Sequence, residues 1–211
     1  MLRKAKREAI LNILEETYKD TKTALNYNSP FELLIAVILS AQCTDERVNK
    51  ITARIFPRLN TPEKMGALTQ EQMEQEIRDC GLYRAKAKNL LATCKMLVEE
   101  FNSTVPDNIA TLMKLPGVGK KTANVIASII YNVPAIAVDT HVFRVSHRLG
   151  MAKGADPLAT EKELQKAIPK EKWSDAHHWF IWHGRLVCKA RKPNCSECVL
   201  LQVCPFKEKN L

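Results

Sequence analysis

Apolar residues recur at helical spacing along most of the sequence, and this periodicity restricts the possible folds more than any other feature. Between residues 4 and 18, for example, Ile10, Ile13, Leu14 and Tyr18 fall on one helix face. Sustained alternation of apolar and polar residues, which indicates a half-buried strand, is absent. We therefore predict an all-α protein. Helices are expected from Pro30 onwards and at about 4–18, 45–55, 70–79, 84–101, 107–114, 120–131, 140–149, 157–168 and 173–187.

Helix-start signals support these assignments. In "NSPFELLIAVILSAQ", Ser29 is the expected N-cap, Pro30 occupies the first helical position and Glu32 completes a capping box. The helix that follows is apolar nearly all round, so we expect it in the core. Further boundary signals are a capping box at Thr69 and Gln72, a helix-closing Gly81, and a start at Asp156 and Pro157.

Charge and composition limit the class of partner. The 211 residues carry a formal net charge of +9, which favours an anionic partner, with nucleic acid ahead of a membrane surface. A merely solvated basic surface is the alternative. We expect no signal peptide, because "MLRKAKREAI" is charged, and no membrane span, because the longest apolar run, "LLIAVILSA", is too short. The seven cysteines do not resemble a secreted disulfide framework, so we expect a reducing, intracellular compartment.

The stretch "LPGVGKKTAN", residues 115–124, lies between two short helical patterns. Pro116 cannot continue the first helix, while Gly117 and Gly119 permit positive φ and close backbone approach. Backbone N–H groups at the start of the second helix form a site suited to a phosphate. A purely structural turn is the alternative. The spacing is that of a helix–hairpin–helix, and we expect it to bind phosphate.

Lys120 and Lys121 stand at a helix start, where the macrodipole disfavours cations. A helix N-terminus and a neighbouring cation both favour the neutral amine, which is a nucleophile able to form a Schiff base. Simple phosphate contacts by both lysines are the alternative. Downstream, Asp139 in "VDTH" is expected to cap a helix, and it could also take a proton from a lysine or stabilise positive charge developing on a sugar.

Four cysteines crowd the C-terminal region in a C-x6-C-x2-C-x5-C pattern. Four thiolates at such spacing hold a metal centre far more often than they remain free, although spacing does not decide between zinc and an iron–sulfur cluster. The other three cysteines, Cys43, Cys80 and Cys94, are expected to be small buried residues on apolar helix faces. The ligands would be Cys188, Cys195, Cys198 and Cys204, and the loop between them carries the basic residues Lys189, Arg191 and Lys192.

Together, "LPGVGKKTAN", "VDTH" and the cysteine loop closely resemble the endonuclease III family of the helix–hairpin–helix DNA glycosylase superfamily. The resemblance covers nearly the whole chain and includes "SPFELLIAVILSAQCTD" and "GLYRAKAKNL". It implies two helical domains with a DNA-binding cleft between them. One would be a six-helix barrel with the hairpin at 22–132. The other would be a domain of residues 1–21 plus 133–211, in which the four cysteines hold a [4Fe–4S] cluster.

The resemblance also implies a base-excision repair activity. Lys121 matches the nucleophile of the family and Asp139 its catalytic aspartate, so Lys120 would face a phosphate. Such an enzyme flips an oxidised pyrimidine out of the duplex. Its lysine attacks C1′ and displaces the base, which forms a Schiff base, and β-elimination of the 3′ phosphate then cleaves the abasic site. The expected partner is double-stranded DNA that contains damaged pyrimidines or abasic sites. We expect a monomer that acts in the cytoplasm at the nucleoid, with no membrane partner.

Further positions match residues that contact DNA in this family. Gln42 resembles the residue that fills the hole left by the flipped nucleotide, and Leu82 the apolar wedge in the base stack. A helix-end core contact is the alternative for Leu82. Ser40, Asp45 and His141 are expected to line the base pocket. The remaining DNA-binding residues would be Gly117, Gly119, Lys120, Lys189, Arg191 and Lys192.

Two other functions fit part of this pattern. A monofunctional mismatch glycosylase, such as the adenine-specific type, shares the hairpin, the aspartate and the cluster loop but lacks a lysine at the position of Lys121. A non-enzymatic helix–hairpin–helix DNA-binding module would explain the hairpin and the charge. It would not explain a lysine and an aspartate that both match catalytic positions.

Overall fold

The computed structural model describes residues 2–211, which contain helices and no strand. The prediction of an all-α protein is therefore confirmed over this range. In chain order the helices are α1 (Lys4–Tyr18), α2 (Pro30–Ser40), α3 (Asp45–Ile55), α4 (Pro62–Gly66), α5 (Gln70–Glu76), α6 (Tyr83–Glu100), α7 (Ile109–Leu112), α8 (Lys120–Tyr131), α9 (Thr140–Arg148), α10 (Pro157–Ala167), the 3₁₀ helix η1 (Lys170–Lys172) and α11 (Trp173–Leu186).

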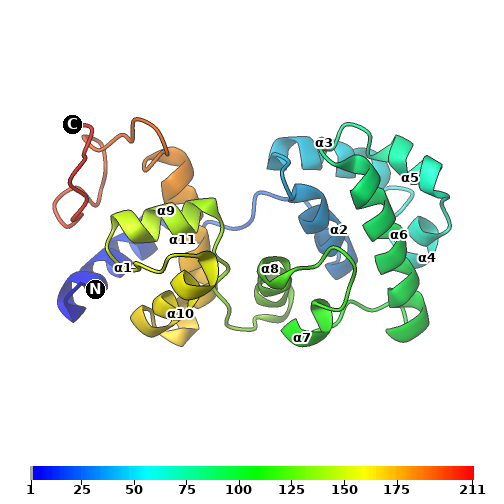
Figure 1. Ribbon diagram of the computed structural model, residues 1–211, viewed down its shortest axis with the longest axis horizontal. Coiled ribbons are helices and arrows are strands. Elements are labelled where there is room, and N and C mark those ends of the chain that lie inside the picture. Colours follow the sequence, from blue (N-terminus) through cyan, green and yellow to red (C-terminus); the bar gives the residue numbers. More distant parts are fainter. Residues whose placement is uncertain (1) are drawn as a thin grey trace. The chain divides into compact units, whose positions relative to one another are not determined.

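The chain divides into two compact units, each with its own helices (Figure 1). The first unit is continuous in sequence, from Ala24 to Tyr131, and contains α2 to α8. The second unit combines the N-terminal segment that ends at Thr23 with Asn132–Leu211, and contains α1, α9, α10, η1 and α11.

Helix α2 forms the centre of the first unit. Its residues from Phe31 to Leu39 are all buried, as expected for a helix that is apolar nearly all round. It packs against α3, α6 and α8, while α6 also contacts α4 and α5. Because α2 lies among these helices, the chain emerges from the core at the C-terminal end of α2 and continues directly into the segment around Gln42.

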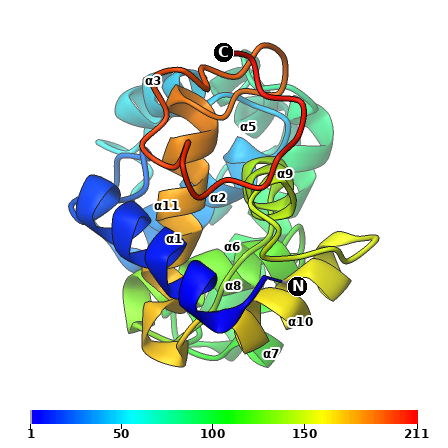
Figure 2. The ribbon, with the colours of Figure 1, turned by 90° about the vertical axis from the view of Figure 1, so that its left-hand side faces the viewer.

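Helix α11 has the corresponding role in the second unit. It lies against both α1 and α9, which Figure 2 shows with α11 in orange, α1 in blue and α9 in yellow-green. The core here includes Ile10 and Leu14 from α1, Val145 from α9 and the fully buried Phe180 from α11. Burial of an aromatic side chain of this size contributes about 3–5 kcal/mol relative to alanine.

The expected helices are present, with differences at their ends. The helix expected at 70–79 ends at Glu76, and the one expected at 107–114 is confined to Ile109–Leu112. The sequence analysis missed α4 and η1, because elements of five and three residues are too short for helical periodicity to show. Thr61 and Pro62 were the available signals for α4, since Thr61 caps it and Pro62 occupies its first turn.

Most capping predictions are confirmed, with two exceptions. Thr69 and Gln72 form the expected reciprocal capping box, and Asp156 caps α10. Ser29 caps α2, but the Glu32 carboxylate accepts from the N–H of Asn28 at 2.6 Å, so no reciprocal box forms there.

The helix-closing role expected for Gly81 was wrong. Helix α5 ends earlier, and Gly81 is not among the residues with positive φ. The left-handed conformation falls instead on Leu82, the N-cap of α6.

The core of the second unit gives a direct stability test. Phe180→Ala should lower the free energy of unfolding by about 3–5 kcal/mol, because it opens a cavity in a fully buried region. Leu186→Ala on the same helix is the control, since Leu186 is 55% exposed and its truncation should change stability by less than about 0.5 kcal/mol. Urea denaturation followed by circular dichroism measures both. Equal losses would contradict this packing.

Candidate active site and metal centre

A tight turn joins α7 to α8. Gly117 adopts φ 78°, a left-handed conformation that glycine reaches without strain. The N–H of Val118 donates to the carbonyl of Leu115 at 3.0 Å, and both side chains are buried. Gly119 does not take positive φ, so that part of the sequence prediction was wrong, and a Cβ there would meet nothing within 4 Å.

The turn is anchored to α6. A Cβ on Gly117 would lie 3.0 Å from the side-chain nitrogen of Asn89, so this position needs glycine for its close approach as well as for its φ. The Thr93 hydroxyl donates to the carbonyl of Pro116 at 2.9 Å. The hairpin therefore has a fixed position on α6, which determines where α8 begins.

Both lysines at the start of α8 are exposed, and the first turn of this helix contains no acidic residue. The Lys121 amine has no hydrogen-bond or ion-pair partner within residues 2–211. The opposite face of α8, which includes Ala123, Ile126 and Ala127, is buried. The helix thus presents an accessible amine on a rigid support, next to backbone N–H groups that suit an anion.

Gln42 and Leu82 lie on neighbouring segments of the same unit. Both are exposed and both adopt positive φ, 53° for Gln42 and 60° for Leu82. A Cβ on Gly81 would lie 3.1 Å from the carbonyl oxygen of Gln42, so the two segments approach each other closely. Leu82 is 58% exposed, which excludes the helix-end core contact.

Two of the expected pocket residues lie close to Gln42 in the chain. The Ser40 hydroxyl donates to the carbonyl of Val37, one turn earlier in α2, at 2.8 Å. Asp45 is the first residue of α3 and is half-buried.

In the second unit, Asp139 caps α9 as expected. Its Oδ1 accepts from the backbone N–H groups of His141 and Val142, both at 2.8 Å. These bonds fix the carboxylate at the helix N-terminus, where the macrodipole stabilises its charge. Because both bonds use Oδ1, Oδ2 keeps its capacity to accept a proton or to face a positive centre.

His141 follows Asp139 in the first turn of α9 and is half-buried. Burial is the largest cause that lowers its pKa below the usual value. A guanidinium nitrogen of Arg144 lies 3.2 Å from Nδ1, and because arginine can only donate, Nδ1 accepts. His141 is therefore neutral at pH 7, with its proton assigned to Nε2.

The four-cysteine loop is attached to the core of the second unit. Cys188, Cys198 and Cys204 pack against that core, and all four cysteines are half-buried. The Arg148 guanidinium donates to the carbonyls of Lys189 at 2.7 Å and Ala190 at 3.0 Å. Arg148 thereby fixes the start of the loop.

The chemistry of this donor set fits a thiolate-bound metal centre. Burial is the largest cause that raises the pKa of the Cys198 and Cys204 thiols, and the neighbouring thiols raise it further. Close thiolates therefore need metal cations to neutralise them. Four thiols in one short loop can hold a tetrahedral zinc or an iron–sulfur cluster.

A hydrogen-bonded chain supports the loop from the core, and the sequence analysis missed it. The Tyr18 hydroxyl lies 3.0 Å from Nδ1 of His183, whose Nε2 lies 3.7 Å from the Cys198 sulfur. Burial raises the pKa of Tyr18 to about 12 and lowers that of His183 to about 4, so both stay neutral. Tyr18 can then donate to His183, which in turn donates to a Cys198 thiolate.

The basic residues of the loop, Lys189, Arg191 and Lys192, are all exposed. Lys192 adopts φ 47°, an unusual conformation for a lysine. Asn194 donates its N–H to the carbonyl of Val187 at 3.0 Å, which closes the loop on itself. The three cations are thus held outward by a folded loop.

The expectation for the remaining cysteines was partly wrong. Cys80 and Cys94 are buried as predicted, but Cys43 is half-buried. Only Cys94 lies on a helix, since Cys43 precedes α3 and Cys80 follows α5. Apolar neighbours in the sequence suggested helix faces for segments that are in fact turns.

Family comparisons agree with this geometry. Residues 35–170 match the model of the HhH-GPD superfamily base excision DNA repair proteins, and residues 188–204 match the iron–sulfur binding domain of endonuclease III. Endonuclease III of Escherichia coli (strain K12) is 49% identical over 208 residues, which cover 99% of each chain. Endonuclease III of Bacillus subtilis (strain 168) is 47% identical over 198 residues, 93% of this chain and 90% of that one.

Solved structures give the same result. A trapped endonuclease III–DNA covalent intermediate has a TM-score of 0.93 and 50% sequence identity, and the match covers 97% of each chain. A thermostable thymine-DNA glycosylase, with a TM-score of 0.86 and 22% identity, shares the fold.

The fold, the hairpin and the cysteine loop thus define a helix–hairpin–helix protein of base-excision DNA repair. Within that class the chain belongs to the endonuclease III family. Its partner is DNA, its activity is that of a DNA glycosylase and abasic-site lyase, and its cofactor is a [4Fe–4S] cluster. Across the described residues, no helix is long and apolar enough to span a bilayer.

The metal centre can be tested by analysis of the purified protein. We expect a yellow-brown protein with about four irons per chain. Cys198→Ser should lower the iron content and destabilise the C-terminal loop, because ligand loss uncouples metal binding from folding. Cys43→Ser is the control, since this cysteine lies in the other unit. A single zinc per chain, or equal iron loss in both variants, would contradict the assignment.

Proposed function

We propose that this chain removes oxidised pyrimidines from duplex DNA and cleaves the resulting abasic site through a Schiff base on Lys121. The observation that carries this proposal is the exposed Lys121 amine, which has no partner within residues 2–211 and stands beside the hairpin turn. Such an amine is accessible to a sugar carbon once a flanking phosphate binds the hairpin.

Lys121 has a defined chemical task in this proposal. Its neutral amine attacks C1′ of the nucleotide, and the N-glycosidic bond breaks as the base leaves with the bonding electrons. Opening of the sugar gives a protonated Schiff base. Loss of a proton from C2′ then expels the 3′ phosphate, which cleaves the strand. Lys120 instead faces a phosphate, because adjacent residues on a helix point in different directions.

Asp139 has two roles in this proposal: it accepts a proton from Lys121, and it stabilises positive charge on the sugar. Its Oδ1 is engaged by the cap of α9, which leaves Oδ2 to receive the lysine proton or to stabilise positive charge on the sugar. A carboxylate fixed by two backbone N–H groups is preorganised for this task. Ser40, Asp45 and His141 line the base pocket in this proposal.

Three of the side chains that we assign to DNA contact share a backbone feature. Six non-glycine residues in the described range adopt positive φ; Asn102, Ser103 and Asn132 are small polar residues that tolerate it well. The other three are Gln42, Leu82 and Lys192, for all of which the family resemblance implies DNA contact. Strained backbone concentrates at functional sites. We infer that Gln42 fills the hole left by the flipped nucleotide and Leu82 enters the base stack.

Phosphates bind at two places in this proposal. The hairpin provides its backbone at Gly117 and Gly119, and the cysteine loop provides Lys189, Arg191 and Lys192. The cluster orders the loop and so fixes its three cations.

We assign residues 22–132 to the six-helix barrel and residues 1–21 plus 133–211 to the cluster domain. The protein acts as a monomer on chromosomal DNA, in the cytoplasm at the nucleoid. A monofunctional glycosylase would not need an amine at position 121, and a DNA-binding module would need Asp139 only as the cap of α9, for which Oδ1 is sufficient. These two residues therefore favour the bifunctional enzyme.

Covalent trapping tests the nucleophile. With abasic duplex DNA and borohydride, the unchanged protein should give a stable protein–DNA adduct. Lys121→Ala should abolish both the adduct and strand cleavage, because no amine remains to form the Schiff base. Lys120→Ala is the matched control and should weaken binding while it still forms the adduct. Similar modest losses in both variants would show that the two lysines only contact phosphate.

Asp139 needs a separate test. Asp139→Asn should slow base removal by about 10² or more and leave binding to an abasic site largely intact. Asparagine caps helices about as well as aspartate, so the loss of stability should stay near the charge–dipole contribution of about 0.3–1 kcal/mol. Unchanged base removal would exclude Asp139 from the chemistry.

A further inference from the structure

We propose that Lys86 is a positioning residue that holds the Gln42 and Leu82 segments together as one rigid wedge. The inference rests on the proposed function, because it concerns how the two inserted residues are supported. Lys86 lies in the first turn of α6 and is only 4% exposed, which is rare for a lysine. The contacts of the Lys86 ammonium group explain why a charged group is buried at this depth.

The ammonium group of Lys86 joins two segments that are far apart in sequence. Its Nζ donates to the carbonyls of Leu39 at 2.8 Å and Ala41 at 2.6 Å, and it lies 3.1 Å from the Cys80 sulfur. These contacts engage all three of its donors. Ala41 immediately precedes Gln42, and Cys80 lies two residues before Leu82.

A cation suits this position for a further reason. Leu39 lies in the last turn of α2 and Ala41 just beyond it, where helical carbonyls lack partners and the macrodipole is negative. The C-cap residue Ala41 has φ −59° and ψ 115°, so no left-handed glycine closes the helix. Lys86 supplies the missing donors. Without it, the carbonyl of Leu39 would keep only the Cys80 thiol, at 3.4 Å, as a side-chain donor, and the part-buried carbonyl of Ala41 would lose its ammonium donor.

The two supported residues need such a constraint. Gln42 and Leu82 both hold positive φ, which is sterically unfavourable for a non-glycine residue. Such conformations persist only where the surrounding structure enforces them. The carbonyl of Gln42 also lies against Gly81, where a Cβ would be 3.1 Å away. The two segments therefore contact each other directly, and Lys86 binds to both of them.

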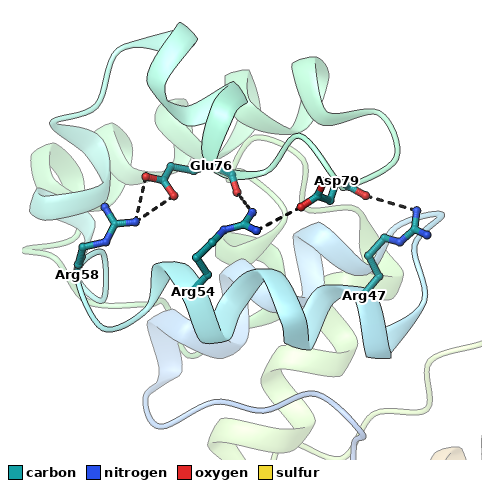
Figure 3. A network of polar contacts seen from close by, with 5 residues as sticks. All are labelled: Arg47, Arg54, Arg58, Glu76 and Asp79. Carbon is teal, nitrogen blue, oxygen red and sulfur yellow. Dashed lines mark hydrogen bonds and ion pairs between the residues drawn. The ribbon is translucent and has the colours of Figure 1, made fainter.

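A second set of contacts holds only one of the two segments. Figure 3 shows Arg54 between the carbonyl of Glu76, at 2.6 Å, and the Asp79 carboxylate, at 3.3 Å. Arg58 pairs with Glu76, and Arg47 reaches the carbonyl of Asp79. These pairs lie at the surface, where ion pairs contribute little to stability. These contacts hold the segment that precedes Cys80 against the region of α3. They do not reach Gln42, so they cannot replace Lys86.

This placement has a catalytic consequence. In the proposed function, Leu82 enters the stack and Gln42 fills the vacated space as the base is extruded. If the two segments move independently, fewer encounters produce a correctly placed nucleotide. A misplacement of 1 Å can lower a rate by about 10²-fold. Lys86 thus acts on base removal from duplex DNA through Gln42 and Leu82.

The test compares Lys86→Met with Lys95→Met, which removes an exposed lysine from the same helix. Single-turnover rates are measured on duplex DNA with one oxidised pyrimidine and on single-stranded DNA with one abasic site, which needs no extrusion. We expect Lys86→Met to slow the duplex reaction by about 10- to 100-fold. The single-stranded reaction, and both reactions of Lys95→Met, should change by no more than about twofold. Equal slowing on both substrates would overturn the proposal.

A double-mutant cycle with Leu82→Ala shows whether Lys86 acts through the wedge. The double variant should be scarcely slower than Leu82→Ala alone, because Lys86 has nothing left to position. Additive effects would contradict the inference. If Leu82→Ala and Gln42→Ala leave the duplex reaction unchanged, the proposed insertion itself is wrong. Failure of the Lys86 inference and failure of the proposed insertion therefore give different results.

A second variant covers the case in which Lys86→Met does not fold, as judged by iron content and circular dichroism. Gly81→Ala keeps Lys86 and needs no positive φ, but its methyl group presses on the carbonyl of Gln42. It should slow the duplex reaction selectively and spare the single-stranded one. Unchanged duplex activity, or equal slowing on both substrates, would overturn the proposal for a coupled wedge.

Discussion

One face of α6 supports every segment that we assign to DNA within the first unit. Residues at positions i, i+4, i+7 and i+11 of a helix lie on one face. Leu82 is the N-cap of α6 and is exposed, and Lys86 holds the end of α2. Asn89 and Thr93 contact the hairpin turn at Gly117 and Pro116. The wedge, the segment of Gln42 and the phosphate-binding turn therefore share one rigid support, and their spacing follows from helix geometry.

The positions of the exposed basic residues also fit contact with DNA. Lysines at the start of α8 oppose the macrodipole, so they contribute nothing to the stability of that helix. The cations of the cysteine loop are likewise held outward, by a loop that Arg148 and the metal ligands fold. Cations that oppose a helix macrodipole, or that a folded loop holds in solvent, indicate a polyanionic partner. The buried ammonium of Lys86 is the exception, because its partners are carbonyls within the protein.

The sequence predicted much of this molecule, and the gaps have physical causes. Long amphipathic helices and N-caps such as Asp139 show in local patterns, which is why α1, α3 and α8 were predicted to the residue. The short α4 and η1 escaped because periodicity needs several turns. Lys86 and the chain from Tyr18 to Cys198 escaped because their contacts join residues 45 and 165 positions apart. The positive φ of Leu82 had no local signal, since leucine rarely adopts it.

We propose that α6 presents three segments to DNA together. Hydrogen–deuterium exchange on the protein bound to abasic duplex DNA measures this directly. We expect the amides of residues 41–43, 81–83 and 117–121 to gain protection in parallel as the DNA concentration rises. The amides of residues 26–28, at the opposite end of α2 from Gln42, should exchange as in the free protein. Protection confined to residues 117–121 would contradict the account, because the hairpin would then bind DNA without the wedge.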